Sequence, residues 1–102
     1  MERLDPITPG EILLEEFLKP YKISQTKLAS DLDIPISRVS DIIKGRRAIT
    51  VNTAVRFAEY FKTTVAFWLN LQNNYEIEKA ERSGEYKAII SNIRSNHYIK
   101  ST

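Results

Sequence analysis

The sequence contains no cysteine in its 102 residues. This absence excludes disulfide bonds, thiol catalysis and zinc sites built on cysteine. There is one histidine, His97, and it lies in a polar stretch that we expect to be frayed from Ser95 onward. The chain also offers no Ser/His/Asp set, no metal-ligand spacing and no glycine-rich phosphate loop. We therefore expect no enzyme, no cofactor and no metal site.

Long apolar runs are missing as well. No stretch approaches the roughly 18 residues that a transmembrane helix requires, so a membrane partner is not expected. The first residues lack the apolar core of a secretory signal. Apolar residues make up 42% of the chain and charged residues 27%, which is ordinary for a globular domain. The length allows one domain with a modest core, and we expect a cytoplasmic protein.

Glycine and proline are few, and their positions predict helix ends. Thr8-Pro9-Gly10-Glu11 has the pattern of a capping box, in which the Thr8 hydroxyl accepts from the Glu11 amide. Pro20 is expected to end this first helix, because the residue before a proline is pushed out of the helical region. The three glycines are interpreted as helix boundaries. Further helices are predicted over residues 25–32 after Ser24, over 35–44 before Gly45, after Thr50, and after Thr64 as far as Arg82.

No alternating segment of convincing strand length occurs before residue 86. We therefore predict an all-α fold: a five-helix bundle in residues 1–82 and a C-terminal extension in residues 83–102. Within the extension, Tyr86, Ile89, Ile90 and Ile93 have the spacing of an amphipathic helix, although their β-branched character also allows a strand. This apolar stripe could extend a dimer interface, cover the helical bundle or bind a different protein partner.

Positive charge is concentrated in one part of the chain, although the net charge is only +2. Residues 1–34 carry four Lys/Arg and seven Asp/Glu, residues 35–62 carry six and two, and residues 63–102 carry five and four. The excess of positive charge, +4, therefore lies in residues 35–62. Such a patch is the electrostatic footprint of a polyanion, but it is also common on solvated faces that have no partner.

The basic segment coincides with the outline of a helix-turn-helix. Two short helices, 25–32 and 35–44, are joined by a tight turn, and the second helix of such a motif enters the major groove of DNA. Val39 and Ile42 are expected to anchor that second helix on the first. Ser37, Asp41 and Lys44, at i, i+4 and i+7, then share the opposite face.

These segments resemble a known family. "SQTKLASDLDIPISRVSDIIKGRRAIT" is similar to the helix-turn-helix of the lambda-repressor-like, or XRE, family. With "TPGEILLEEFLKP", "AVRFAEYFKTT" and "FWLNLQNNYEIE", residues 8–82 resemble the HigA-type antitoxins, a group that includes proteins labelled virulence-associated protein I.

The resemblance implies a lambda-repressor-like bundle of five helices, a homodimer and binding to a palindromic operator in double-stranded DNA. It also implies a cognate toxin of the HigB type, a small mRNA-cleaving protein that the antitoxin neutralises while it represses the shared operon. Two alternatives are a repressor of the same fold without a toxin, and a protein-interaction module that has lost DNA binding. The acidic Asp41 and the low net charge support the last of these.

The resemblance also assigns roles on the second helix of the motif. Ser37, Ser40 and Asp41 match base-facing positions of the family. A serine hydroxyl can donate to or accept from a base, and a carboxylate can accept from the cytosine amine. Asp41 could instead pair with Arg38. Ile36 could touch a thymine methyl or only pack at the helix start. Pro35 stands where the family leads us to expect serine or threonine.

Phosphate contacts are predicted from residues around this helix. By resemblance, Gln25 is a phosphate clamp at the start of the first helix. The cations expected to meet phosphate oxygens are Arg38, Lys44, Arg46 and Arg47. Thr50 and Asn52 could add neutral hydrogen bonds, and Arg56 is expected to be solvated.

A run of large apolar residues follows Thr64. Trp68, together with Phe67, Leu69, Leu71 and Tyr75, is predicted to be mostly core. These side chains cannot all point inward from one helix, so some are expected to face a partner in a dimer.

Overall fold

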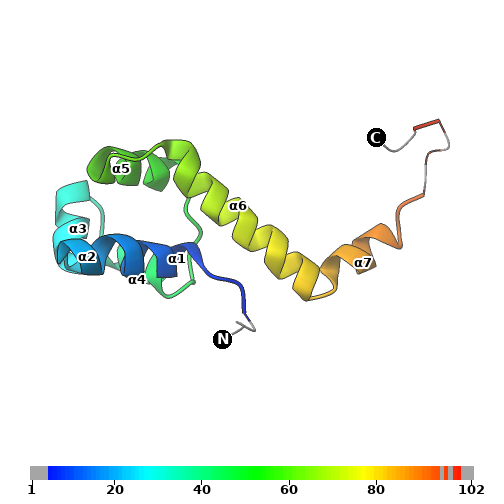
Figure 1. The fold of residues 1–102 in the computed structure, drawn as a ribbon, viewed down its shortest axis with the longest axis horizontal. Coiled ribbons are helices and arrows are strands. Elements are labelled where there is room, and N and C mark those ends of the chain that lie inside the picture. The colour runs from blue at the N-terminus through cyan, green and yellow to red at the C-terminus, as the bar shows by residue number, and fades with distance from the viewer. Residues whose placement is uncertain (1–4, 95, 97, 100–102) are drawn as a thin grey trace.

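The computed structural model describes residues 5–94, 96, 98 and 99, and every regular element within those ranges is a helix (Figure 1). This confirms the all-α prediction. Ser95 and His97, where the frayed end was predicted, lie outside the described residues. No helix in the described ranges is long and apolar enough to cross a membrane. The elements in chain order are α1 Pro9–Ile12, η1 Leu13–Leu18, α2 Lys19–Tyr21, α3 Gln25–Leu32, α4 Ile36–Ile43, α5 Val51–Phe61, α6 Val65–Arg82 and α7 Glu85–Ile90.

The first three elements form one continuous helical rod, and Pro20 does not end it. The chain leaves the helix only at Lys22, which has a left-handed φ of 56°. A π-helical segment, η1, widens the helical turn just before the proline, where the Lys19 N–H donates to the carbonyl of Leu14. The wider turn makes room for a residue that has no N–H to donate, so the prediction of a helix end at Pro20 was wrong.

Side chains cap three of the helix starts as predicted. The hydroxyls of Thr8, Ser24 and Thr64 accept from backbone N–H groups three residues on, at 3.1, 3.0 and 3.0 Å. Thr50 has the extended backbone of a cap residue, but its side chain makes no capping bond to α5. Thr50 therefore stands at the predicted start of the helix, but the predicted capping hydrogen bond from its side chain is absent.

The core lies where the first rod, α3, α4, α5 and α6 meet. Trp68 is fully buried, with its ring centroid 4.9 Å from that of Phe17 and 5.0 Å from that of Phe57. Leu69 and Leu71 pack against this core, so Phe67, 37% exposed, is the outward-turned large side chain of the run. The buried apolar residues are Leu13, Leu18, Leu28, Ala29, Leu32, Ile34, Val39, Ile42, Ile49, Ala54, Phe57, Ala58 and Trp68.

Gly10 brings the first rod into backbone contact with α4. A Cβ added to Gly10 would overlap the carbonyl oxygen of Ile42 and lie 2.7 Å from the Cα of Ile43. Both neighbours are main chain and cannot rotate away. The interpretation of Gly10 as only a helix boundary was therefore incomplete, because this glycine sets the distance between α1 and the end of α4.

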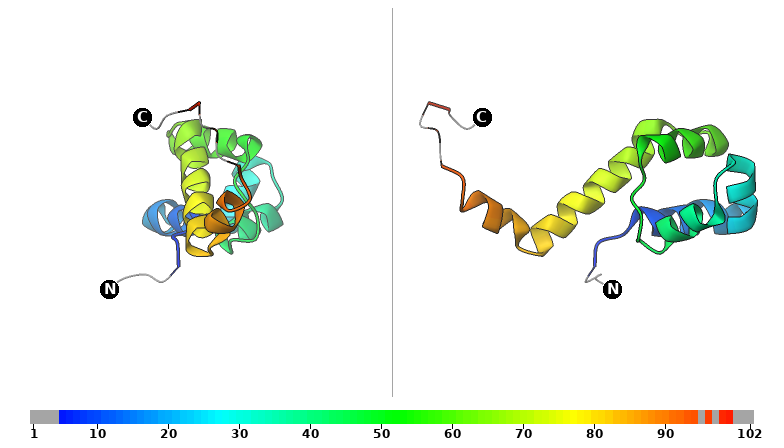
Figure 2. Two further views of the ribbon diagram at one scale, coloured as in Figure 1. Left: turned by 90° about the vertical axis from the view of Figure 1, so that its right-hand side faces the viewer. Right: turned by 180° about the vertical axis from the view of Figure 1, so that it is seen from behind.

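The C-terminal part of the chain projects from the bundle. The second half of α6 extends away from the other helices, and α7 lies at its far end (Figures 1 and 2). The radius of gyration is 17.2 Å, against about 13 Å for a compact chain of this length. Ser83 ends α6 and Gly84, at φ 83°, starts α7, as the sequence predicted. Of the two alternatives for Tyr86–Ile90, helix is correct.

Candidate nucleic-acid interface

α3 and α4 form the predicted pair of short helices with a tight connection. Asp33 adopts a left-handed φ of 56°, and its N–H donates to the carbonyl of Ser30 at 3.2 Å. The N–H of Ile34 donates to the carbonyl of Ala29 at 3.1 Å. These two bonds close the end of α3 and aim the chain into α4. Val39 and Ile42 are buried against the rest of the motif, so the opposite side of α4 faces outward.

A second tight turn ends α4 and presents its cations. Gly45, at φ 76°, donates to the carbonyl of Ile42 at 3.1 Å, and the N–H of Arg46 donates to that of Asp41 at 2.8 Å. This pair of bonds is the Schellman arrangement for a helix end, and it needs a residue that tolerates positive φ. Lys44, Arg46 and Arg47 are exposed around the turn. Gly45 was thus predicted correctly as the stop of this helix.

Most of the predicted contact residues are available to a ligand. Ile36 and Ser37 are exposed at the start of α4, whereas Ser40, Asp41 and Gln25 are half-buried. Of the nine predicted residues, eight have no side-chain hydrogen bond or ion pair with any residue that the structure describes. These eight are Gln25, Ile36, Ser37, Ser40, Asp41, Lys44, Arg46 and Arg47.

Arg38 is the exception, and its partner is not the predicted one. Its Nη1 donates to Oδ1 of Asn52 at 3.1 Å. The same oxygen accepts from Nε of Arg56 at 3.2 Å, and Nη1 of Arg56 donates to the carbonyl of Leu32. The network joins α3, α4 and the first turn of α5. Arg56 is half-buried, so the expectation that it is solvated was wrong, and Arg38 is held by Asn52 and not by Asp41.

A shallow cleft of about 320 Å³ lies beside this network. Arg38 and Arg47 line it together with Thr50, Asn52 and Thr53 at the start of α5. Because the Thr50 side chain does not cap the helix, the first N–H groups of α5 remain open at the cleft. Two guanidinium groups and a helix N-terminus together make a site with a strongly positive potential.

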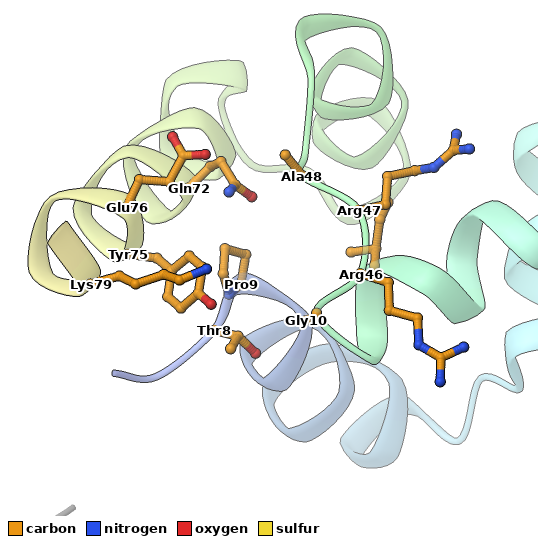
Figure 3. A pocket seen from close by; sticks show the side chains of 12 residues that line it. Thr8, Pro9, Gly10, Arg46, Arg47, Ala48, Gln72, Tyr75, Glu76 and Lys79 are labelled. Atoms are coloured by element: carbon orange, nitrogen blue, oxygen red, sulfur yellow. The ribbon is translucent and has the colours of Figure 1, made fainter. Parts of the chain in front are cut away.

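The loop after α4 is held from behind by α6. Oε1 of the buried Gln72 accepts from the N–H of Ile49 at 2.9 Å. Next to this bond is a pocket of about 160 Å³ between the start of α1, the loop and α6 (Figure 3). Figure 3 shows the side chains of Arg46 and Arg47 directed away from α6, to the other side of the loop. Gln72 thus fixes the loop so that its cations point outward.

Replacing Gln72 by alanine is expected to destabilise the fold by about 1–3 kcal/mol, because the buried N–H of Ile49 would lose its acceptor. Urea denaturation of the full chain measures this change. Gln72→Glu, which keeps an acceptor oxygen, should recover part of the loss, and Asn73→Ala, at an exposed neighbour, should have little effect. Equal stabilities for Gln72→Ala and Asn73→Ala would contradict the role of this bond.

A polar brace connects α3 to α5. The Tyr60 hydroxyl donates to Oδ2 of Asp31 at 2.6 Å, and Nζ of Lys27 lies 3.0 Å from the same oxygen. The bond from Tyr60, then that from Lys27, holds the pKa of the Asp31 carboxyl below its usual value. The brace therefore stabilises the fold fully at a pH above the ordinary pKa of Asp31. This stabilisation is lost as the pH falls through the lowered pKa of the folded state.

Sequence reasoning missed the contacts that support the interface from behind. Gln72 carries no signal in the sequence, because a glutamine in a helix is usually exposed. Asn52 was noted only as a possible contact, and its position as shared acceptor for two arginines depends on how α4 meets α5. Within the described ranges, no three His, Cys, Asp or Glu side chains gather as a metal ion would require.

Comparisons with known proteins agree with this geometry. Residues 14–68 match the helix-turn-helix family. The chain is 42% identical over 84 residues to virulence-associated protein I of Dichelobacter nodosus, covering 82% of this chain and 78% of that protein. An addiction module antidote protein of the HigA family from Coxiella burnetii superposes with a TM-score of 0.81 at 44% identity, covering 91% of this chain and 100% of that one. The antitoxin HigA of Pseudomonas aeruginosa, solved with the higBA promoter, gives a TM-score of 0.80 at 39% identity, covering 87% and 96%.

Proposed function

Because the chain belongs to the helix-turn-helix family and its structural neighbours are HigA antitoxins, we propose that it is a dimeric, sequence-specific DNA-binding antitoxin that represses its own operon. The family is one of DNA-binding proteins and not of enzymes, in agreement with the sequence prediction. One observation carries the proposal: α4 presents the hydroxyls of Ser37 and Ser40, and the turn after it presents three cations, and none of these side chains has a partner in the described part of the chain.

In this proposal α4 enters the major groove with its N-terminal half toward the bases. Ser37 is exposed and free to rotate its hydroxyl as donor or acceptor. Ile36 lies beside it, 49% exposed, where its side chain suits a thymine methyl. Ser40 and Asp41 are less exposed, and Asp41 would accept from a cytosine amine. The carboxylate disfavours nearby phosphates, so Asp41 contributes to base selection more than to affinity.

Phosphate contacts would flank the groove on both sides. Lys44, Arg46 and Arg47 lie around the turn after α4, and Gln25 lies at the start of α3. The cleft beside α5 adds Arg38 and the open N–H groups of the first turn. Such contacts fix the register of the protein on DNA and supply affinity that does not depend on sequence.

Ser37→Ala is expected to change the base preference at one position in each half-site while leaving affinity for unrelated DNA nearly constant. The loss for the preferred site should be about 1–3 kcal/mol. Selection from a randomised DNA library followed by sequencing measures the preference. Ser30→Ala, at an exposed serine of α3, is the matched control. An unchanged selection profile for Ser37→Ala would remove Ser37 from the base-reading residues.

The antitoxin part of the proposal requires a protein partner, and we propose a HigB-type toxin, a small mRNA-cleaving protein encoded beside this chain. Co-expression with the product of the neighbouring gene tests it: growth should be rescued and the two proteins should co-purify. A neighbouring product that is harmless when expressed alone would favour the alternative, a stand-alone repressor of the same fold.

A further inference from the structure

The pocket behind the loop after α4 is lined by polar groups that the proposed DNA interface does not use. It has a volume of about 160 Å³ and lies between the start of α1, the loop and α6 (Figure 3). The side chains of Arg46 and Arg47 are directed away from α6, so the cations of the loop do not turn toward that helix. A molecule in this pocket would therefore meet other side chains than DNA meets.

One face of α6 supplies most of the polar lining. Gln72, Tyr75, Glu76 and Lys79 lie at i, i+3, i+4 and i+7, which is the spacing of residues on one side of a helix. Figure 3 shows these side chains projecting from α6 toward α1 and the loop. The remaining wall consists mostly of small or apolar residues, namely Thr8, Pro9, Gly10, Ile42, Gly45 and Ala48. The pocket thus joins a polar wall to a mostly apolar one.

Gln72 brings a hydrogen-bond donor without a partner to this pocket. Its side chain is only 9% exposed, and Oε1 accepts from the N–H of Ile49, but Nε2 donates to no residue that the structure describes. Within the same residues, every polar side-chain atom that is shut off from solvent has a partner. Nε2 is therefore open to the pocket that Gln72 lines. A ligand with an acceptor oxygen would satisfy this donor, which is costly to leave without a partner in a buried side chain.

Two opposite charges at the pocket do not neutralise each other. Glu76 and Lys79 have the i, i+3 spacing at which a helical ion pair is favourable, yet the ion pairs of the described residues do not include this one. Nζ of Lys79 instead lies 5.8 Å from the ring centroid of Tyr75. The pocket therefore offers one ligand both a carboxylate and an ammonium group.

We propose that this pocket binds a small α-amino acid. The ligand carboxylate accepts from Nζ of Lys79 and from Nε2 of Gln72, and the ligand ammonium group donates to Glu76. Glu76 disfavours a polyanion, and a simple carboxylate or a simple amine leaves one of the two charges unmatched. The volume of about 160 Å³ is below the roughly 300 Å³ at which sites for drug-sized ligands begin, so the ligand is of the size of alanine or serine.

A nuclear magnetic resonance titration of the full chain tests the inference, because the side-chain NH₂ group of Gln72 gives its own signals. L-alanine or L-serine should shift these signals and the amide signals of Ala48 and Ile49 saturably, with a dissociation constant below about 1 mM. L-tryptophan should bind at least about tenfold more weakly because it exceeds the volume of the pocket. Acetate and ethylamine should also bind at least about tenfold more weakly, because each matches only one of the two charges.

Substitutions at the two charges locate the ligand. Lys79→Met and Glu76→Gln should each raise the dissociation constant for L-alanine at least about tenfold, since each removes one charge and keeps the length of the side chain. Lys87→Met and Glu81→Gln are the matched controls, at exposed positions that do not line the pocket, and should bind like the unmodified chain. All four variants should keep the Tm of the unmodified chain, because the replaced side chains are exposed.

The absence of any saturable shift at Gln72 with either amino acid, at about ten times the expected dissociation constant, would overturn the inference. Acetate that binds as tightly as L-alanine would also overturn it, because the pocket would then be a simple anion site. So would Lys79→Met and Glu76→Gln variants that bind as tightly as their controls. The titration contains neither DNA nor a second protein, so none of these results bears on the proposed function.

Discussion

Gly10→Ala is expected to destabilise the fold by at least about 3 kcal/mol and to lower Tm by about 12 °C or more. The added methyl would overlap the main chain of Ile42 and Ile43 at the end of α4. Flexible side chains can move aside, but two backbones in contact can separate only if α1 or α4 shifts as a whole. The same shift would displace the cationic turn, so DNA binding should weaken as well. Thermal and urea denaturation measure the loss.

Gly84→Ala is the control for this prediction. The chemical change is the same, but a Cβ at Gly84 meets nothing within 4 Å. Its cost comes only from the left-handed backbone at φ 83° and should be about 1 kcal/mol. If Gly10→Ala were no more destabilising than Gly84→Ala, the close approach of α1 to α4 would be contradicted.

Removing the three cations around the end of α4 is expected to have the largest effect on DNA binding. Lys44→Ala/Arg46→Ala/Arg47→Ala should weaken binding on the order of a hundredfold or more, for operator and unrelated DNA alike. These cations are exposed and have no partner among the described residues, so the free protein loses no ion pair when they are removed. The slope of log K against log salt concentration should become shallower by about 0.9 for each lost phosphate contact. Fluorescence anisotropy over a salt series gives both quantities.

A second triple variant separates contact from overall charge. Lys19→Ala/Lys62→Ala/Lys87→Ala removes the same number of positive charges from exposed positions on other elements. Lys19 and Lys62 already pair with Glu15 and Glu59. This variant should keep most of its affinity and salt slope. Equal losses in the two variants would mean that only the net charge matters, and that the turn after α4 does not touch phosphate.

The sequence predicted those features whose causes lie within a few residues of each other. The caps at Thr8, Ser24 and Thr64 depend on one hydroxyl and an amide three residues away. The stop at Gly45 depends on a residue that tolerates positive φ. The division of α4 into a buried and an open face follows from the spacing of its apolar residues. Local rules of this kind do not require knowledge of what packs against the helix.

Most of the features that sequence reasoning missed depend on tertiary contacts. Gly10 looks like a helix-start glycine until α4 is seen against it, and Arg56 looks solvated until the end of α3 supplies a carbonyl. Pro20 ends a regular helix by the local rule, but the π-helical segment before it carries the chain past the proline. The apolar spacing of α7 can be read from the sequence, but the position of this helix away from the bundle depends on the path of α6.

Footprinting on the DNA upstream of the gene for this chain tests the central claim most directly. The account predicts a protected palindrome whose half-sites are centred about 34 Å apart, one helical turn, on one face of the duplex. Protection should disappear for the variant that lacks Lys44, Arg46 and Arg47, at concentrations where the unmodified protein protects fully. If the unmodified dimer left this DNA uniformly accessible, or covered it without any preference for sequence, α4 would not be a recognition helix.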